Sequence, residues 1–257
     1  MTFTAAVAGK GGVGKTSVAA LLVKYFTEEK GGTVLAVDAD PNSNLDEKLG
    51  VMTGKTLGSL REEVSGDMDS KPAGVSKAER AEYLVRTAIV EGRKFDLLAM
   101  GRSEGPGCYC YVNNLLRTLV DSISEKYPYV VIDNEAGMEH LSRRTTRSVD
   151  MLLVVSDTSP TGLKTAGRLR KLADEMGLKR GKTVLLLNRA GEKAGAAGES
   201  IGESAGGNHT AGFDMTWQLP EDRSLNDYNS ECKSLLGLPR DSPAYGSLGE
   251  MMERMLK

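Results

Sequence analysis

Short runs of consecutive apolar residues recur along the chain, each about as long as one β-strand. The runs are Phe3–Ala8, Thr33–Asp38, Phe95–Met100, Tyr129–Asp133, Met151–Val155 and Thr183–Asn188. A continuous apolar run of this length, bounded by glycines or polar residues, is typical of a strand that is buried on both faces of a sheet. The pattern therefore predicts a sheet whose core is built from these segments.

Between several of these runs, the apolar residues change to the three- and four-residue spacing of an α-helix. This spacing predicts helices over Gly14–Phe26, Asn113–Glu125 and Leu163–Met176. Near the end of the chain, one helical face is predicted to carry Leu248, Met251, Met252, Met255 and Leu256. Strands that alternate with helices in this way predict the α/β class, with a mostly parallel sheet covered by helices on both faces.

The 257 residues contain no internal repeat and no clear linker, so we predict one domain spanning residues 1–257. Its least regular part is expected in the charged stretch 44–93, where residues 66–80 are the most loop-like. Residues 192–210 are rich in small residues and are expected to form a surface insertion.

Composition excludes several classes of function. The net charge of −2 provides no basic field that would attract nucleic acid or acidic lipid. Three cysteines are too few for a secreted disulfide framework. The first residues lack the features of a signal peptide, and no run approaches the roughly 18 apolar residues of a membrane helix. We therefore expect a cytoplasmic protein without nucleic-acid or membrane partners.

The strongest motif is GKGGVGKT, Gly9–Thr16, which fits G-x-x-x-x-G-K-[ST] between a predicted strand and a predicted helix. Its glycines let backbone N–H groups face phosphate oxygens, and the helix amino terminus adds its positive dipole end. Lys15 is expected to reach the β- and γ-phosphates, and Thr16 to ligate Mg²⁺. The nucleotide-binding residues predicted here are Gly9, Lys10, Gly11, Gly12, Val13, Gly14, Lys15, Thr16 and Ser17.

A second lysine, Lys10, directly follows the first glycine of this loop. With it, KGGVGKT resembles the deviant phosphate loop of the family that includes MinD, ParA and the nitrogenase iron protein. The resemblance implies a P-loop ATPase that binds ATP or ADP with Mg²⁺ and works as a homodimer. It also implies that Lys10 crosses the dimer interface and acts catalytically on the partner's nucleotide, as an arginine finger does elsewhere.

Asp38 and Asp40 follow the second strand and are expected at the sheet edge that faces the phosphate loop. The resemblance implies that Asp38 holds Mg²⁺ through water and that Asp40 orients or deprotonates the attacking water. The alternative interpretation is an Asx-type turn that leads into Pro41.

Asp133 ends the apolar strand in VVIDNEAGMEH, where a Walker B carboxylate belongs. Gly137 is expected to bring its N–H to the γ-phosphate and to release it after hydrolysis. Glu135 and Glu139 are interpreted as solvated loop carboxylates, with charged switch-face residues as the alternative. His140 is interpreted as a structural residue, with a role in the switch as the alternative.

Two later segments resemble the adenine pocket of the family. Asn188, at the end of LLLNR, corresponds to the residue that hydrogen bonds the base. Leu219 and Pro220, in WQLPED, correspond to the segment whose backbone reads the base edge.

Cys108 and Cys110 lie one residue apart, between a predicted strand and a predicted helix. Two such thiolates supply half of the four soft ligands of a tetrahedral metal site, and a twofold-related copy would supply the other half. We therefore predict a site for Ni²⁺ or Zn²⁺ shared across the dimer, and the sequence does not choose between these metals. The alternatives are two ordinary loop cysteines or a redox pair. Cys232 is interpreted as a small core or surface residue.

The phosphate loop, the CYC loop and DNEAGMEH together resemble the CooC group of this family, the accessory ATPases for nickel insertion into carbon monoxide dehydrogenase. The resemblance runs from Gly9 to about Asp222. It implies a dimeric metallochaperone with carbon monoxide dehydrogenase as its client. The chain lacks a histidine-rich tail, which favours a single bridging ion over bulk nickel storage.

Three competing interpretations share the nucleotide site. A ParA-like ATPase that acts on DNA would need a basic face, and Leu141–Arg147 (LSRRTTR) is the local basic cluster. A MinD-like membrane ATPase would need a basic amphipathic helix at the carboxyl end, but the polar face there carries Glu250 and Glu253. An iron–sulfur reductase would need a cysteine in the second switch, where this chain has none.

Overall fold

The computed structural model describes residues 2–40, 44–60, 77–101, 118–134, 148–191, 195–196 and 212–256. Within these ranges nine strands form one sheet in the order β3-β4-β2-β5-β1-β6-β7-β9-β8. The strands are β1 (Phe3–Gly9), β2 (Val34–Asp38), β3 (Val90–Glu91), β4 (Phe95–Ala99), β5 (Tyr129–Asp133), β6 (Ser148–Ser156), β7 (Lys179–Leu187), β8 (Gly195–Ala196) and β9 (Met215–Gln218). Pairing is parallel throughout, except where the short outer strands β3 and β8 join antiparallel to β4 and β9.

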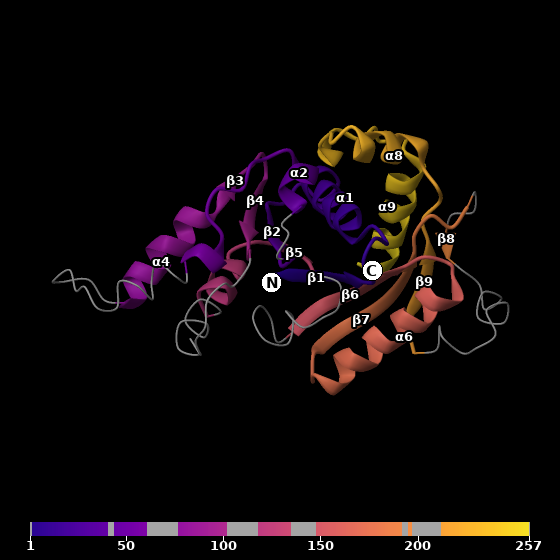
Figure 1. Ribbon diagram of the computed structural model, residues 1–257, viewed down its shortest axis with the longest axis horizontal. Helices are drawn as coiled ribbons and strands as arrows, with labels where there is room; N and C mark the ends of the chain where they lie inside the picture. Colours follow the sequence, from indigo (N-terminus) through magenta and orange to yellow (C-terminus); the bar gives the residue numbers. More distant parts are fainter. Residues whose placement is uncertain are drawn as a thin grey trace.

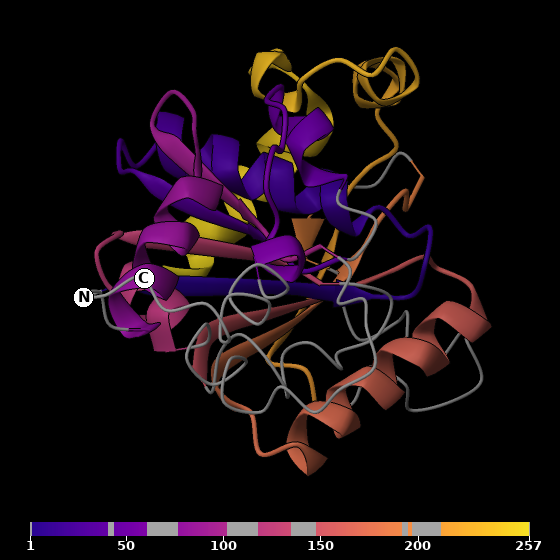
Figure 2. The same ribbon diagram turned by 60° about the vertical axis from the view of Figure 1, so that its left-hand side comes forward.

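Helices cover both faces of the sheet (Figure 1 and Figure 2). One apolar cluster joins the sheet to α1 (Lys15–Glu28), α2 (Leu45–Leu49), α8 (Arg223–Ser230), the short 3₁₀ helix η2 (Leu235–Gly237) and α9 (Pro243–Met255). A second cluster joins the other face to α4 (Lys77–Ala88), the helical residues 118–124 and α6 (Pro160–Glu175). Side chains alternate between the clusters along the central strands, so Val131 of β5 lies in the first and Ile132 in the second.

The predicted α/β class and all the predicted strands are confirmed, with small changes at their ends. The fifth begins earlier than predicted, at Ser148, and the sixth at Lys179. The first residues of β7 are mostly exposed, although this end of the strand pairs with β6. Because these first residues of β7 are mostly polar, an apolar run in the sequence does not mark where the strand begins.

The helices predicted over Gly14–Phe26 and Leu163–Met176 are α1 and α6. α6 begins earlier than predicted because Ser159 caps it, accepting the N–H of Gly162 at 3.0 Å, and Pro160 follows. The predicted helix over Asn113–Glu125 is confirmed over residues 118–124, and its first part lies outside the described residues.

The loop expected over residues 66–80 is wrong at its end, because α4 already begins at Lys77. The helix buries Leu84, Val85 and Ala88 on the second face of the sheet. Its charged first turn resembles a loop in composition, so the signal lies in the apolar spacing further along the helix.

The predicted carboxyl-terminal helix is α9, and its apolar face is covered by the chain itself. Leu248, Met251 and Met252 are fully buried in the cluster that contains α1. Trp217 of β9 donates its indole N–H to the Ser247 hydroxyl at 3.0 Å, which ties α9 to the sheet. In the part of the chain that is described, no helix is long and apolar enough to cross a membrane.

Candidate nucleotide-binding site

The phosphate loop connects β1, in the middle of the sheet, to α1. Gly14 is the residue before α1 and adopts the left-handed region, with φ of 93° and ψ of 25°. A Cβ atom there would lie 2.5 Å from the amide nitrogen of Asn188. At Gly9, a Cβ atom would collide with the carbonyl oxygen of Val155. Both positions therefore require glycine for the loop to close over the sheet edge.

The amino terminus of α1 leaves backbone donors for an anion. The first helical bond runs from the N–H of Val18 to the carbonyl of Gly14 at 3.0 Å, so the N–H groups of Lys15, Thr16 and Ser17 precede it. No side chain caps this end of α1. These donors and the helix dipole form a site suited to phosphate oxygens.

Lys15 is buried at the base of the loop, with 8% of its surface exposed. Its ammonium group donates to the carbonyl oxygen of Lys10 at 3.2 Å. The side chain of Lys10 is exposed, and its action on another subunit stays a prediction. The loop thus holds one cation inside the site and presents a second on its surface.

Two carboxylates lie side by side at the carboxyl edge of the sheet. Asp38 of β2 and Asp133 of β5 are register partners, and both are essentially fully buried. Burial raises the pKa of Asp133 to about 7, which the Thr16 hydroxyl and the Lys15 charge oppose and the Asp38 charge reinforces. Burial also raises the pKa of Asp38 to about 6, against hydrogen bonds from the N–H groups of Leu45 and Asp40.

The surroundings of Asp133 fit a magnesium ion. The Thr16 hydroxyl hydrogen bonds to its carboxylate, while the buried Oδ1 atom has no hydrogen-bond partner. A buried oxygen without a partner is costly unless a ligand completes it. Magnesium prefers few protein oxygens and completes its shell with water and phosphate. Thr16 and Asp133 could therefore hold a magnesium ion beside the phosphate loop, and their role as its ligands stays a prediction.

The segment after β2 forms the turn that the sequence left as an alternative. Oδ1 of Asp38 accepts the N–H of Asp40 at 3.0 Å, and Oδ2 accepts the N–H of Leu45 at 3.0 Å. Because β2 ends at Asp38, strand alternation does not set the direction of Asp40, which is half-buried. Asp38 thus shapes the loop, and the magnesium and water roles of Asp38 and Asp40 stay predictions.

The predicted adenine residues lie at the same edge. The Asn188 amide donates to the carbonyl of Val13 at 2.9 Å, which ties the end of β7 to the phosphate loop. The N–H of Leu219 donates to Leu187 at 2.8 Å, and its carbonyl accepts the N–H of Ala190 at 3.0 Å. Base recognition by Asn188, Leu219 and Pro220 stays a prediction.

Sequence reasoning missed Asn134, directly after Asp133. Its backbone N–H and its side-chain amide both donate to the carbonyl of Val7, at 3.0 and 2.8 Å, and it is 1% exposed. These two hydrogen bonds fix the residue after β5 to β1. An amide residue next to a strand-ending aspartate was the available signal.

Asp222 was also missed as an organising residue. Its Oδ1 accepts the N–H of Leu225 at 3.1 Å, and its Oδ2 accepts the hydroxyl of Ser242 at 2.5 Å and the N–H of Ala244 at 3.0 Å. Despite burial, these hydrogen bonds lower the pKa of Asp222. One carboxylate therefore fixes the starts of both α8 and α9.

We expect Asp222→Ala to lower the free energy of unfolding by about 2–4 kcal/mol, because it removes a helix cap and leaves buried donors without an acceptor. Urea unfolding measures this change. Asp241→Ala removes an exposed neighbouring carboxylate and is expected to cost less than about 0.5 kcal/mol. Equal losses in the two variants would contradict the role of Asp222.

Several predicted residues lie outside the described residues. They are Cys108, Cys110, Glu135, Gly137, Glu139, His140, the segment Leu141–Arg147 and most of the 192–210 insertion. Cys232 is described and is exposed. Among the described residues, no three His, Cys, Asp or Glu side chains are grouped to hold a metal ion.

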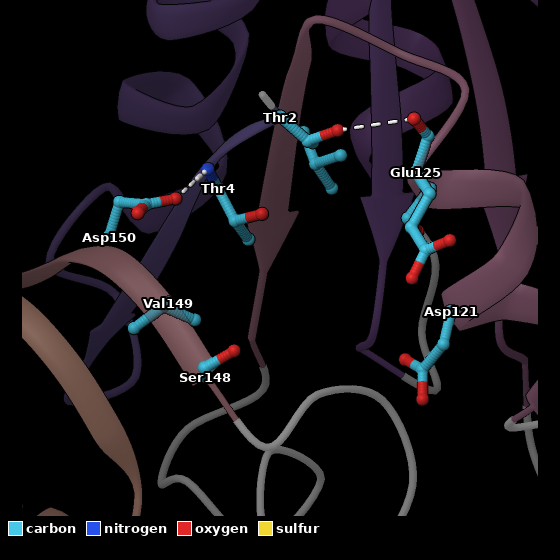
Figure 3. Close-up of a pocket in the computed structure, with 9 residues that line it drawn as sticks. Thr2, Thr4, Asp121, Glu125, Ser148, Val149 and Asp150 are labelled. Atoms are coloured by element: carbon cyan, nitrogen blue, oxygen red, sulfur yellow. Dashed lines mark hydrogen bonds between the residues drawn. The ribbon is translucent and has the colours of Figure 1, made fainter.

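A separate cavity of about 390 Å³ lies at the opposite edge of the sheet, near the amino ends of β1, β5 and β6 (Figure 3). Among the described residues, its lining includes the carboxylates Asp121, Glu125 and Asp150 and no lysine or arginine. Oxygen-rich walls without a cation do not suit a phosphate. The described donors that suit a phosphate lie instead at the carboxyl edge, around the phosphate loop.

These features define a P-loop ATPase. They are the glycine loop between β1 and α1, the buried Lys15, and Asp133 at a strand end beside the Thr16 hydroxyl. Residues 1–184 match the protein-family model described as "AAA domain". The chain is 40% identical over 253 residues to the uncharacterized ATP-binding protein MJ0685 of Methanocaldococcus jannaschii, which covers 98% of this chain and 97% of the relative.

The chain is also 32% identical over 185 residues to the carbon monoxide dehydrogenase accessory protein CooC of Rhodospirillum rubrum, covering 68% of this chain and 70% of that protein. Its fold matches that of the septum site-determining protein MinD complexed with Mg-ADP from Pyrococcus horikoshii, with a TM-score of 0.67 and 22% identity over 100% of this chain and 98% of that one. The chain belongs to the MinD/ParA family of P-loop ATPases, as its phosphate loop predicted.

Proposed function

We propose that the chain is an ATP-hydrolysing, homodimeric maturation factor that assists nickel insertion into carbon monoxide dehydrogenase. The pairing of the phosphate loop with Thr16 and Asp133 carries the ATPase part of this proposal. The client part rests on the relative named as a carbon monoxide dehydrogenase accessory protein and on the CYC sequence.

In the proposed reaction, the N–H groups at the start of α1 and the Lys15 ammonium group hold the phosphates of ATP. Thr16 and Asp133 hold Mg²⁺, which neutralises phosphate charge when bound. Asp40 orients the water whose oxygen forms a bond to the γ-phosphorus as the bond to the β–γ bridging oxygen breaks. ADP keeps the bridging oxygen, and the water proton passes to Asp40 or to the released phosphate. Lys10 of a second copy stabilises the negative charge that develops on the β–γ bridging oxygen.

The nickel or zinc ion is the cargo in this proposal. Cys108 and Cys110 of two subunits would provide four thiolates, which suit Zn²⁺ in a tetrahedral site and Ni²⁺ in a flatter one. ATP binding favours a compact dimer through contacts from Lys10, Asp40 and Gly137, and hydrolysis removes them. Metal affinity and nucleotide state are then linked in both directions.

The alternative is a ParA- or MinD-like switch that acts on DNA or on a membrane. Against membrane action, the apolar face of α9 is already buried by α1 and the sheet. Filter binding to DNA at low salt and flotation with liposomes test this alternative.

We expect about one metal ion per dimer in the wild type, and none in the double variant Cys108→Ala/Cys110→Ala, because two thiolates per subunit are needed for four ligands. Elemental analysis and size exclusion with light scattering measure this, with and without Ni²⁺, Zn²⁺ and ATP. Cys232→Ala removes the exposed third thiol and is the matched control. Metal retained by the double variant, or an unchanged dimer that binds no metal, contradicts the shared site.

A further inference from the structure

A side-chain hydrogen bond connects the phosphate-loop helix to α8. The hydroxyl of Ser17 donates to the amide oxygen of Asn229 at 3.1 Å, and both residues are half-buried. Ser17 is the third residue of α1 and the last one before the first helical hydrogen bond. Asn229 belongs to the last turn of α8, more than two hundred residues further along the chain.

The position of Asn229 is fixed from both ends of its helix. Asp222 anchors the start of α8 to the start of α9 through Ser242 and Ala244. Near the other end of α8, the Tyr228 hydroxyl donates to the carbonyl of Gly237 in η2 at 2.9 Å. Figure 1 shows α8 packed at the same end of the molecule as α9. Contacts at both ends of α8 therefore fix the position of the Asn229 amide next to Ser17.

A serine hydroxyl has one proton to donate. In this structure, the Ser17 hydroxyl donates that proton to the amide oxygen of Asn229. A phosphate at the start of α1 would be a stronger, charged acceptor for the same proton. An asparagine amide has both an acceptor and donors, so rotation of the Asn229 amide would let it donate to the Ser17 oxygen while the hydroxyl turns to the phosphate.

We propose that Asn229 is a positioning residue of the nucleotide site, which holds the Ser17 hydroxyl. When a nucleotide phosphate binds at the start of α1, the Asn229 amide turns, so that its N–H donates to the Ser17 oxygen in place of its own oxygen accepting the Ser17 proton. This inference rests on the proposed nucleotide site. It also makes α8, and through Asp222 the segment around Pro220, responsive to phosphate occupancy.

The first test compares Asn229→Asp with Asn226→Asp. Aspartate at 229 can only accept, so it retains the Ser17 proton and adds a negative charge near the phosphate. We expect it to weaken MgADP binding about tenfold or more, measured by calorimetric titration. Asn226 is exposed on the same helix, so Asn226→Asp makes the same charge change and is expected to alter affinity less than about twofold.

The second test is a double-mutant cycle with Ser17→Ala and Asn229→Ala. Asn229→Ala alone is expected to weaken MgADP binding about three- to tenfold and to raise KM for ATP with kcat nearly unchanged. In the Ser17→Ala background, Asn229→Ala is expected to have no further effect, because the hydroxyl it positions is gone. Additive losses in affinity overturn the proposal, since they would mean that Asn229 does not act through Ser17.

The outcomes separate this inference from the function on which it rests. Wild-type protein that does not bind MgADP overturns the proposed ATPase site and the role of Asn229 together. Wild-type binding with equal affinities for Asn229→Asp and Asn226→Asp overturns the role of Asn229 alone. Urea unfolding of each variant confirms that the affinities compare folded proteins.

Discussion

Lys15→Ala is expected to abolish measurable ATP hydrolysis, with a loss of about a thousandfold or more. Lys15 is the buried cation of the phosphate loop, held at 3.2 Å from the carbonyl of Lys10. Its charge stabilises the β- and γ-phosphates as negative charge shifts toward the leaving oxygen. Phosphate release from MgATP measures the rate, and titration with MgADP separates lost binding from lost chemistry.

A lysine outside the site provides the control for charge. Lys171→Ala removes an exposed lysine of α6, on the other face of the sheet. We expect this variant to keep wild-type hydrolysis within about twofold, because exposed charges at a distance are screened by salt. If Lys15→Ala and Lys171→Ala hydrolysed ATP at the same rate, Lys15 would not stabilise the phosphates as expected.

Asp133→Asn is expected to make the nucleotide-free protein more stable while it removes activity. Burial raises the pKa of Asp133 to about 7 from its usual value near 3.8, so between these pH values the folded protein binds more protons than the unfolded chain. Stability therefore falls as pH rises through this window and is level above it. Asp38, with a pKa of about 6, changes stability in the same direction.

At pH 8 the neutral amide avoids the cost of a buried charge, so we expect Asp133→Asn to unfold at a higher urea concentration, with a gain of about 1–3 kcal/mol. The same variant loses a magnesium oxygen, and hydrolysis is expected to fall by about a hundredfold or more. The stability gain should shrink below pH 5, where the wild-type carboxylate is protonated. A variant that is less stable than the wild type at pH 8 would show that burial of this charge is not a cost.

Local sequence signals predicted the framework of the site. They did not predict contacts between residues that lie far apart in the sequence. The phosphate loop and Asp133 are visible in sequence because a strand end, a glycine pattern and a helix start adjoin along the chain. The sequence indicates the turn at Asp38 only as an alternative, because strand alternation and an Asx turn fit the same residues. The start of β7 was missed because its residues are polar yet paired to β6.

The contacts of Asn188 and Asn229, and those of Asp222 with Ser242 and Ala244, had no signal in spacing or composition. Asn188 was assigned by resemblance to an adenine role, and its contact with the carbonyl of Val13 depends on the placement of β7 beyond β6. Asn229 touches Ser17 only because the chain returns to α1 after β9. Such pairings follow from the order of strands in the sheet, which no local pattern specifies.

The strand order also sets when the site can exist during synthesis. β1 and the phosphate loop leave the ribosome first, yet β1 lies between β5 and β6, which are made much later. Asn188 and Asn229 reach the loop only after most of the chain has emerged. Because domains fold as units once their non-local contacts can form, a nascent or truncated chain carries the phosphate-loop sequence without a working pocket. We therefore expect ATP hydrolysis only from chains that extend through β7 and α8.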